Sequence, residues 1–135
     1  MAQVTAKLFN YRQAPRKVRI VANLVRGKSV PVAVNELAFL AKRASDPIKK
    51  LLLSGVANAK NLNVPADSLF VKEIRVDQGA IMKRSMPRAR GRAFPIHKHT
   101  SHIILTLDTE NPIEVKKAAR KAAKASPRAT SGQVK

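Results

Sequence analysis

Residues 69–107 read LFVKEIRVDQGAIMKRSMPRARGRAFPIHKHTSHIILTL, and most of the fold follows from this stretch. At its start the pattern has a period of two, with Phe70, Lys72, Ile74 and Val76 alternating with Leu69, Val71, Glu73, Arg75 and Asp77. This period predicts a strand with one buried face. At its end, residues 100–107, TSHIILTL, have the composition of a second strand. We expect the two to pair antiparallel, with residues 3–10 as a candidate third strand.

The segment between these two strands, residues 79–99, is far longer than an ordinary hairpin loop. Hairpin loops usually have about two to five residues, and a long structureless loop inside a compact domain is unusual. We therefore predict that the segment continues as an extended, twisted β-hairpin that projects from the body. About ten residues per arm, at about 3.3 Å each, would reach roughly 30 Å.

The charges of this segment are all positive. Residues 78–107 contain no Asp or Glu, while the segment carries Lys83, Arg84, Arg88, Arg90, Arg92 and Lys98. The planar fork of arginine matches phosphate oxygens. A disordered, solvated loop is the alternative, but the Ile, Met, Pro and Phe residues between the charges favour an ordered binding element. Only Phe94 is aromatic here, which favours folded RNA bound through backbone and shape over stacked single strands.

Three helices are expected before residue 69. The first covers residues 14–28, with Pro15 in its first turn and Gly27 at its C-terminal end. The second begins at Ser29, and the third runs from about Ser45 to Lys60, an earlier start near Lys42 being possible. Their apolar stripes are predicted to be Val18, Val21, Ala22 and Val25; Val30, Ala33, Val34, Leu37 and Ala41; and Ile48, Leu51, Leu52, Val56 and Ala59.

Two local features of these helices carry further predictions. Gly55 interrupts the third helical pattern and indicates close packing against another element. The first helix begins among the cations Arg12, Arg16, Lys17 and Arg19, with no acid before Glu36. An ordinary solvated face is one interpretation of these cations, and we prefer a face that contacts phosphates.

The overall composition limits the classes of function. The 135 residues are 44% hydrophobic and only 4% aromatic, so the core must be aliphatic. Lys and Arg total 27 against 8 Asp and Glu, a net charge of +19, which favours a polyanionic partner. A membrane surface is the rival, but no lipidation motif is visible. There is no apolar run near the roughly 20 residues that span a bilayer, and residues 1–9 do not resemble a signal peptide.

The sequence gives little support for a catalytic site or a metal site. The sequence has no cysteine, which excludes disulfides and thiolate sites and fits a reducing compartment. His97, His99 and His102 are close in sequence but lack nearby acids, so we expect no metal and no cofactor. Residues 26–29, RGKS, end like a phosphate-binding loop but follow a helix and lack the earlier glycine. Glu73 and Asp77 flank Arg75 and indicate an ion-paired surface. We predict no enzyme activity.

The residues also resemble a known family. RQAPRKVRIVANLVRGKS at 12–29, LLLSGVANAKNLN at 51–63 and residues 76–107 are similar, in order and spacing, to the universal large-subunit ribosomal protein family twenty-two. The resemblance covers about residues 3–108. It implies an α+β fold in which three helices pack on a small three-stranded antiparallel sheet with a long projecting β-hairpin. Residues 1–110 would then form one RNA-binding domain.

The resemblance also implies a function. Such a protein is a structural constituent of the large ribosomal subunit, binds 23S-type ribosomal RNA, aids subunit assembly and influences macrolide sensitivity. Its expected partners are that RNA, neighbouring ribosomal proteins and the nascent polypeptide, with no membrane and no small-molecule substrate. Its expected place is the cytoplasmic ribosome, with an organellar ribosome as the less favoured alternative. The tip that would line the polypeptide exit tunnel is Arg88, Ala89, Arg90, Gly91, Arg92 and Ala93. The candidate RNA-binding residues are Arg12, Arg16, Lys17, Arg19, Arg26, Lys28, Lys83, Arg84, Arg88, Arg90, Arg92, His97, Lys98 and His99.

The chain departs from the family pattern at a few places. Ala80 stands where many relatives have proline, and His97 and His99 occupy positions that are often other polar or basic residues. Residues 111–135 form a basic Ala- and Lys-rich tail, predicted to be mobile, to which no family function transfers. Two other hypotheses stay open: a free-standing nucleoid or RNA-chaperone protein with no fixed site, and an enzyme acting on nucleic acid, which would need carboxylates or a metal set that the sequence lacks.

Overall fold

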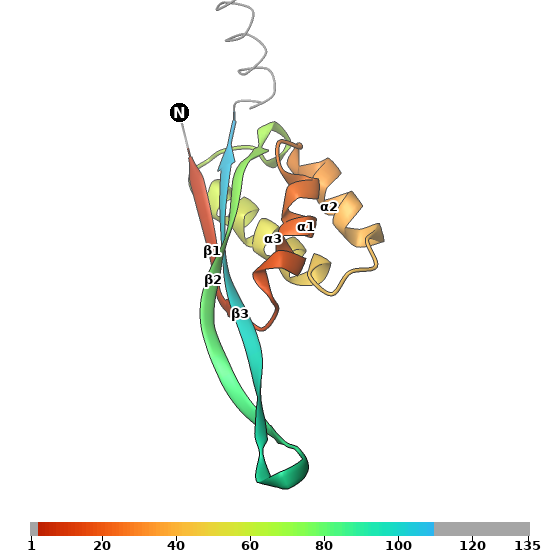
Figure 1. The fold of residues 1–135 in the computed structure, drawn as a ribbon. Helices are drawn as coiled ribbons and strands as arrows, with labels where there is room; N and C mark the ends of the chain where they lie inside the picture. Colours follow the sequence, from red (N-terminus) through yellow and green to blue (C-terminus); the bar gives the residue numbers. More distant parts are fainter. Residues whose placement is uncertain (1–2, 110–135) are drawn as a thin grey trace, which may run out of the picture.

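The computed structural model describes residues 3–109 and has three helices and three strands. In chain order they are β1 (Val4–Tyr11), α1 (Pro15–Val25), α2 (Val30–Phe39), α3 (Ser45–Asn61), β2 (Phe70–Pro87) and β3 (Ala93–Asp108), with short 3₁₀ turns at Ala66–Ser68 and Ala89–Gly91. The helices lie together on one side of the sheet, and β2 and β3 run on beyond them as a projecting hairpin (Figure 1). The predicted α+β fold is confirmed.

The sheet has the order β1-β3-β2, and both pairings are antiparallel. The last strand in sequence therefore lies in the middle of the sheet. On β1, Val4 and Ala6 are buried and Leu8 is half-buried, while Thr5 and Lys7 are exposed. The expected third strand and its alternation are confirmed, because one face of the sheet packs on the helices and the other faces solvent.

The strict alternation expected at the start of β2 is wrong. The pairing with β3 shifts by one residue between Val71 and Glu73. Val71 and Ile74 are both fully buried, whereas Phe70 is half-buried and Lys72 is exposed. A β-bulge of this kind leaves one extra residue without a partner and moves the following side chains to the other face.

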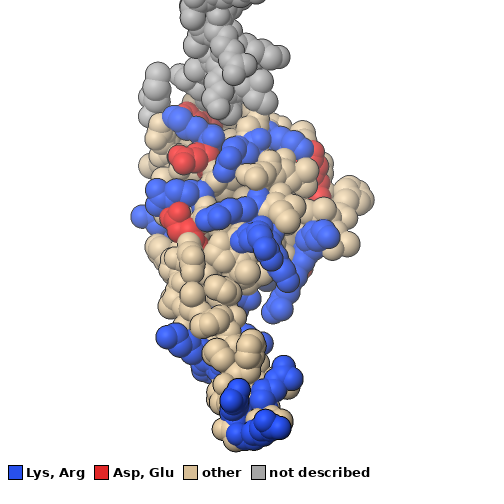
Figure 2. All heavy atoms as spheres, viewed as in Figure 1, with Lys and Arg blue, Asp and Glu red and all other residues tan. Residues whose placement is uncertain are grey.

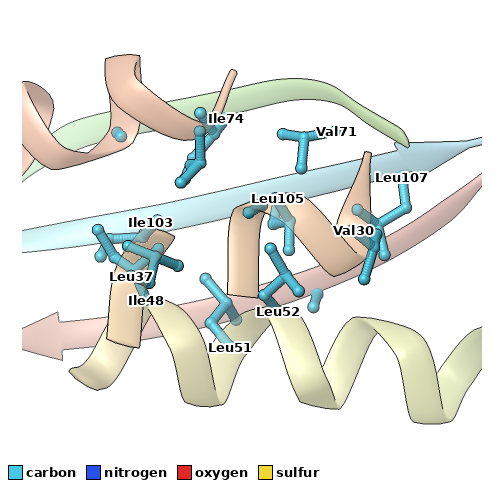
Figure 3. Packing of buried hydrophobic residues seen from close by; sticks show 14 of the residues in the cluster. Val30, Leu37, Ile48, Leu51, Leu52, Val71, Ile74, Ile103, Leu105 and Leu107 are labelled. Atoms are coloured by element: carbon cyan, nitrogen blue, oxygen red, sulfur yellow. The ribbon is translucent and has the colours of Figure 1, made fainter. Parts of the chain in front are cut away.

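The core is aliphatic, as the composition predicts. Leu37, Ile48 and Leu52 of the helices pack against Ile74, Ile103 and Leu105 of the sheet, all at most 1% exposed (Figure 3). The buried hydrophobic residues are all Val, Ile, Leu or Ala, and Phe9, Phe39 and Phe94 are exposed. The stripes predicted for α1 and α3 are buried apart from Val56, which is half-buried.

The helix ends agree closely with the sequence analysis. Pro15 is the first residue of α1, and Gly27, just beyond its end, has a φ of +78°, a conformation that favours glycine. Its N–H donates to the Val71 carbonyl at 2.9 Å. Helix α3 begins at Ser45, so the alternative start near Lys42 is wrong. Ala41 does not extend the stripe of α2, because that helix ends at Phe39 and Ala41 is exposed.

Gly55 lies where α3 meets the sheet. A Cβ atom placed on it would be 3.0 Å from Leu107 Cδ1 and 3.6 Å from Leu105 Cδ2, so the predicted close packing is confirmed. The tail at residues 111–135 lies outside the described residues. Within residues 3–109 there is no helix both long enough and apolar enough to cross a lipid bilayer.

Candidate nucleic-acid interface

The hairpin begins where β1 stops pairing. Beyond the pair of Tyr11 with Ser101, only β2 and β3 continue, from Gln78 opposite Ser101 to Pro87 opposite Ala93. This two-stranded ribbon carries the projecting end of the molecule (Figure 1). The predicted hairpin over residues 79–99 is confirmed in its position and its pairing.

Two irregularities lie at the root of the hairpin, at the same level of β3. On β2 the register shifts between Gln78 and Ile81, and on β1 it shifts between Leu8 and Tyr11. The hydroxyl of Thr100, a residue only 5% exposed, donates to the Ala80 carbonyl at 2.7 Å across the first shift. Bulges increase local twist and bend a strand, so this joint sets the direction in which the hairpin leaves the body.

Gly79 at this joint has no room for a side chain. A Cβ atom there would lie 2.5 Å from Thr100 Oγ1 and 3.0 Å from His102 Nε2. We expect Gly79→Ala to reduce the free energy of unfolding by about 1–3 kcal/mol, the usual cost of overpacking. The loss should be measured by urea denaturation followed by circular dichroism.

A double-mutant cycle separates this clash from a general effect of glycine replacement. Thr100→Ala removes the obstructing oxygen together with its hydrogen bond. The double variant should be more stable than the sum of the two single losses predicts, because the residues are in contact. Strict additivity would contradict the packing assigned to Gly79.

The tip of the hairpin is a tight turn that displays arginine. Arg90 and Gly91 have φ values of +58° and +67°. The Arg88 N–H donates to the Arg92 carbonyl at 2.8 Å, and the Arg88 guanidinium lies 5.9 Å from the centre of the Phe94 ring. The sequence did not predict the left-handed conformation of Arg90, because residues other than glycine adopt it rarely and no neighbouring residue indicates it.

The cations of the hairpin are not neutralised within the described chain. The ion pairs formed within residues 3–109 join Lys28 to Glu36, Lys72 to Asp108 and Arg75 to Asp77, all in the body. Figure 2 shows Lys and Arg gathered at the far end of the hairpin, with Asp and Glu confined to the body. Such a surface is suited to a polyanion, whose phosphates it can neutralise.

Three candidate RNA-binding cations of the body, Arg19, Arg26 and Lys28, have partners inside the protein. Arg19 donates through Nε and Nη2 to the Val76 carbonyl at 3.2 and 3.0 Å, and Arg26 donates to the Ile74 carbonyl at 2.8 Å. Lys28 pairs with Glu36. The contacts of Arg19 and Arg26 connect α1 and the residue after its end to β2. The pair of Lys28 with Glu36 connects the α1–α2 connection to α2. The structure does not bring the three together with the hairpin cations, and a role for them in RNA binding stays a prediction.

Two other candidate cations at the start of α1, Arg12 and Lys17, lie close to the root of the hairpin, whereas Arg16 is exposed and does not line this surface. There a cleft of about 640 Å³ is lined by Arg12, Gln13, Ala14, Lys17, Arg43, Met82, Arg84, His97, Lys98 and His99. Among residues 3–109, no Asp or Glu lines it. It thus unites candidate residues from the start of α1 with others from both hairpin strands. Arg43 was not predicted as a site residue, because the connection between α2 and α3 in which it lies has no recognisable sequence pattern.

Tyr11 holds one wall of the cleft in place. Its hydroxyl donates to the Arg43 carbonyl at 3.1 Å, which fixes the α2–α3 connection to the end of β1. Burial raises the pKa of the Tyr11 hydroxyl, as does nearby Asp46, against the opposing effect of Arg43. The hydroxyl therefore stays protonated, and remains a donor, throughout the physiological range.

The three histidines do not form one group. His97 and His99 are neighbours in the cleft, with ring centres 6.5 Å apart. His102 lies elsewhere: its Nδ1 accepts the Asn10 N–H at 3.1 Å, and its ring lies 5.4 Å from that of Phe9. Within residues 3–109 no three His, Asp or Glu side chains are close enough together to hold a metal ion.

The comparisons with known proteins agree on one family. Residues 6–108 match the family model described as ribosomal protein L22p/L17e. The chain is 50% identical over 109 residues to "Large ribosomal subunit protein uL22" of Mycoplasma capricolum, covering 80% of this chain and 98% of that protein. The proteins of the same name from Bdellovibrio bacteriovorus and Trichlorobacter lovleyi are 50% and 52% identical over 107 and 104 residues. These matches cover 78% and 76% of this chain and 97% and 92% of those proteins.

Proposed function

The chain belongs to the ribosomal protein L22p/L17e family, a family of ribosomal proteins and not of enzymes, and from this we propose that it is a structural component of the large ribosomal subunit that binds large-subunit ribosomal RNA. The proposed RNA binding rests on the charge of the hairpin. Its arginines and lysines project from the body without an acidic partner among residues 3–109. Phosphates of folded RNA supply that partner.

The shape of the hairpin supports a more specific role. A thin ribbon with cations along its length can pass between RNA helices, where a globular surface cannot. We propose that the hairpin runs inward through the ribosomal RNA, that its tip, residues 88–93, lines the nascent-peptide exit tunnel, and that the body contacts neighbouring ribosomal proteins. A protein that contacts several RNA segments at once would also favour their assembly into one subunit. The proposed place of action is the ribosome of the cytoplasm.

The experiment that tests this function is cosedimentation of the tagged protein with ribosomal subunits, washed at rising salt. A site with many shape-dependent contacts should keep the protein on the large subunit, at one copy per subunit, after a high-salt wash. Binding by charge alone falls steeply with salt. Loss at moderate salt, with the protein spread over bulk RNA and DNA, would overturn the proposal in favour of a free-standing nucleic-acid-binding protein.

A further inference from the structure

The cleft at the root of the hairpin is a hollow in the basic surface, lined from the start of α1, the α2–α3 connection and both hairpin strands. We propose that it takes one unpaired nucleotide, turned outward from the folded RNA, with its phosphate on the cations and its base against the histidines. This inference rests on the proposed RNA-binding function and adds to it a site of defined size and chemistry.

The size of the cleft fits a nucleotide. Its volume is about 640 Å³, and pockets that hold ligands of drug size, which includes a nucleotide, have volumes of about 300–1,000 Å³. An RNA duplex presents its phosphates on a convex surface and cannot enter such a hollow. Bases in loops and bulges, in contrast, can be splayed out of the helix and bound individually.

The charge of the cleft fits a phosphate. Arg12 and Lys17 approach from the start of α1, Arg43 from the α2–α3 connection, and Arg84 and Lys98 from the two hairpin strands. Helix α1 adds to this, because its first turn contains no acid and its N-cap Ala14 has no side-chain cap. The unneutralised positive end of the helix dipole then favours an anion.

The remaining lining fits a base. The exposed imidazoles of His97 and His99 can stack on a base, and Met82 offers an apolar contact. Gln13 adds a hydrogen-bonding group, since its Oε1 is buried and has no hydrogen-bond partner within the described part of the chain, although the residue lines the cleft. Unsatisfied buried polar atoms are rare and call for a reason. A turn of this amide toward the base would give it a partner.

The test uses the full-length protein bound to purified large-subunit ribosomal RNA, with every nucleotide probed by 2′-hydroxyl acylation. The cleft variant combines Arg43→Gln with His99→Ala. Both residues are exposed, and the Tyr11 bond goes to the Arg43 carbonyl, so neither change removes a buried side chain, and His99→Ala removes only the ring contact with His97 inside the cleft. The matched control is Lys60→Gln, an exposed charge at the far end of α3.

We expect the wild-type protein and the control to reduce the acylation of one nucleotide that is unpaired in the RNA. The cleft variant should restore its reactivity and leave the other protections unchanged. Its affinity should fall about 10- to 100-fold near 0.1 M salt, through one lost phosphate contact and one lost stack. Unchanged protections with the cleft variant, or changes only in paired RNA, would overturn the inference while the RNA-binding function stands. If the wild-type protein protects no ribosomal RNA, the proposed function itself fails.

Discussion

Replacing Arg84, Arg88, Arg90 and Arg92 together by glutamine is expected to lower the affinity for large-subunit ribosomal RNA about thousandfold near 0.1 M salt. These side chains are exposed and have no acidic partner within residues 3–109. Each phosphate contact contributes about 0.7–0.9 to the slope of log affinity against log salt. Four lost contacts should therefore reduce the slope by about three. Filter binding or fluorescence anisotropy over a range of salt measures both quantities.

The control for this variant removes the same charge from the body. Lys42, Lys49, Lys50 and Lys60 are replaced by glutamine, none of which lies on the hairpin. If only net charge mattered, both quadruple variants would lose affinity equally. We expect the control to lose far less, because the hairpin offers its cations at a fixed spacing along a ribbon. Equal losses would show that the hairpin is not the principal RNA-binding element.

Leu105→Ala is expected to reduce the free energy of unfolding by about 2–5 kcal/mol, the range for large-to-small changes in a core. Leu105 is 1% exposed on the central strand β3, between Ala6 of β1 and Ile74 of β2, and it lies against α3 near Gly55. Domains of this size are stable by only about 5–15 kcal/mol. Denaturation by urea should show a lower midpoint with an unchanged slope.

Leu53→Ala provides the comparison for Leu105→Ala. It makes the same chemical change on α3, where Leu53 is 49% exposed, and surface changes usually alter stability by less than about 0.5 kcal/mol. Comparable losses for both variants would mean that β3 does not anchor the core as described. Retention of RNA binding by folded Leu105→Ala at low temperature would further separate stability from recognition.

The sequence predicted the elements of the fold because their signals are local. Pro15 and Gly27 mark the ends of α1 through their own backbone preferences, and the stripe from Val18 to Val25 follows from the helical period. Gly55 could be interpreted as a packing site because glycine inside a helix is unfavourable without such a reason. The bulge at Lys72 could not be predicted, since a bulge depends on how the partner strand pairs.

The candidate site was predicted less completely than the fold. The charged hairpin was identified from the absence of acids over residues 78–107. The individual RNA contacts stay predictions, and Arg19, Arg26 and Lys28 were named for RNA although each also binds the protein itself. A long cation carries no local signal that distinguishes a phosphate partner from a backbone carbonyl.

By itself, then, the sequence determined the helices, the strands, the hairpin and the excess of positive charge, because periodicity, capping and composition act over a few residues. The tertiary structure alone decided which cations line the same cleft. It brought Arg12, Arg43 and Arg84 into the lining of one cleft, where the Tyr11 hydroxyl donates to the Arg43 carbonyl, and it set the joint of the hairpin at Gly79 and Thr100. These arrangements join residues far apart in the chain, and they depend on how the helices pack on the sheet, which no local pattern records.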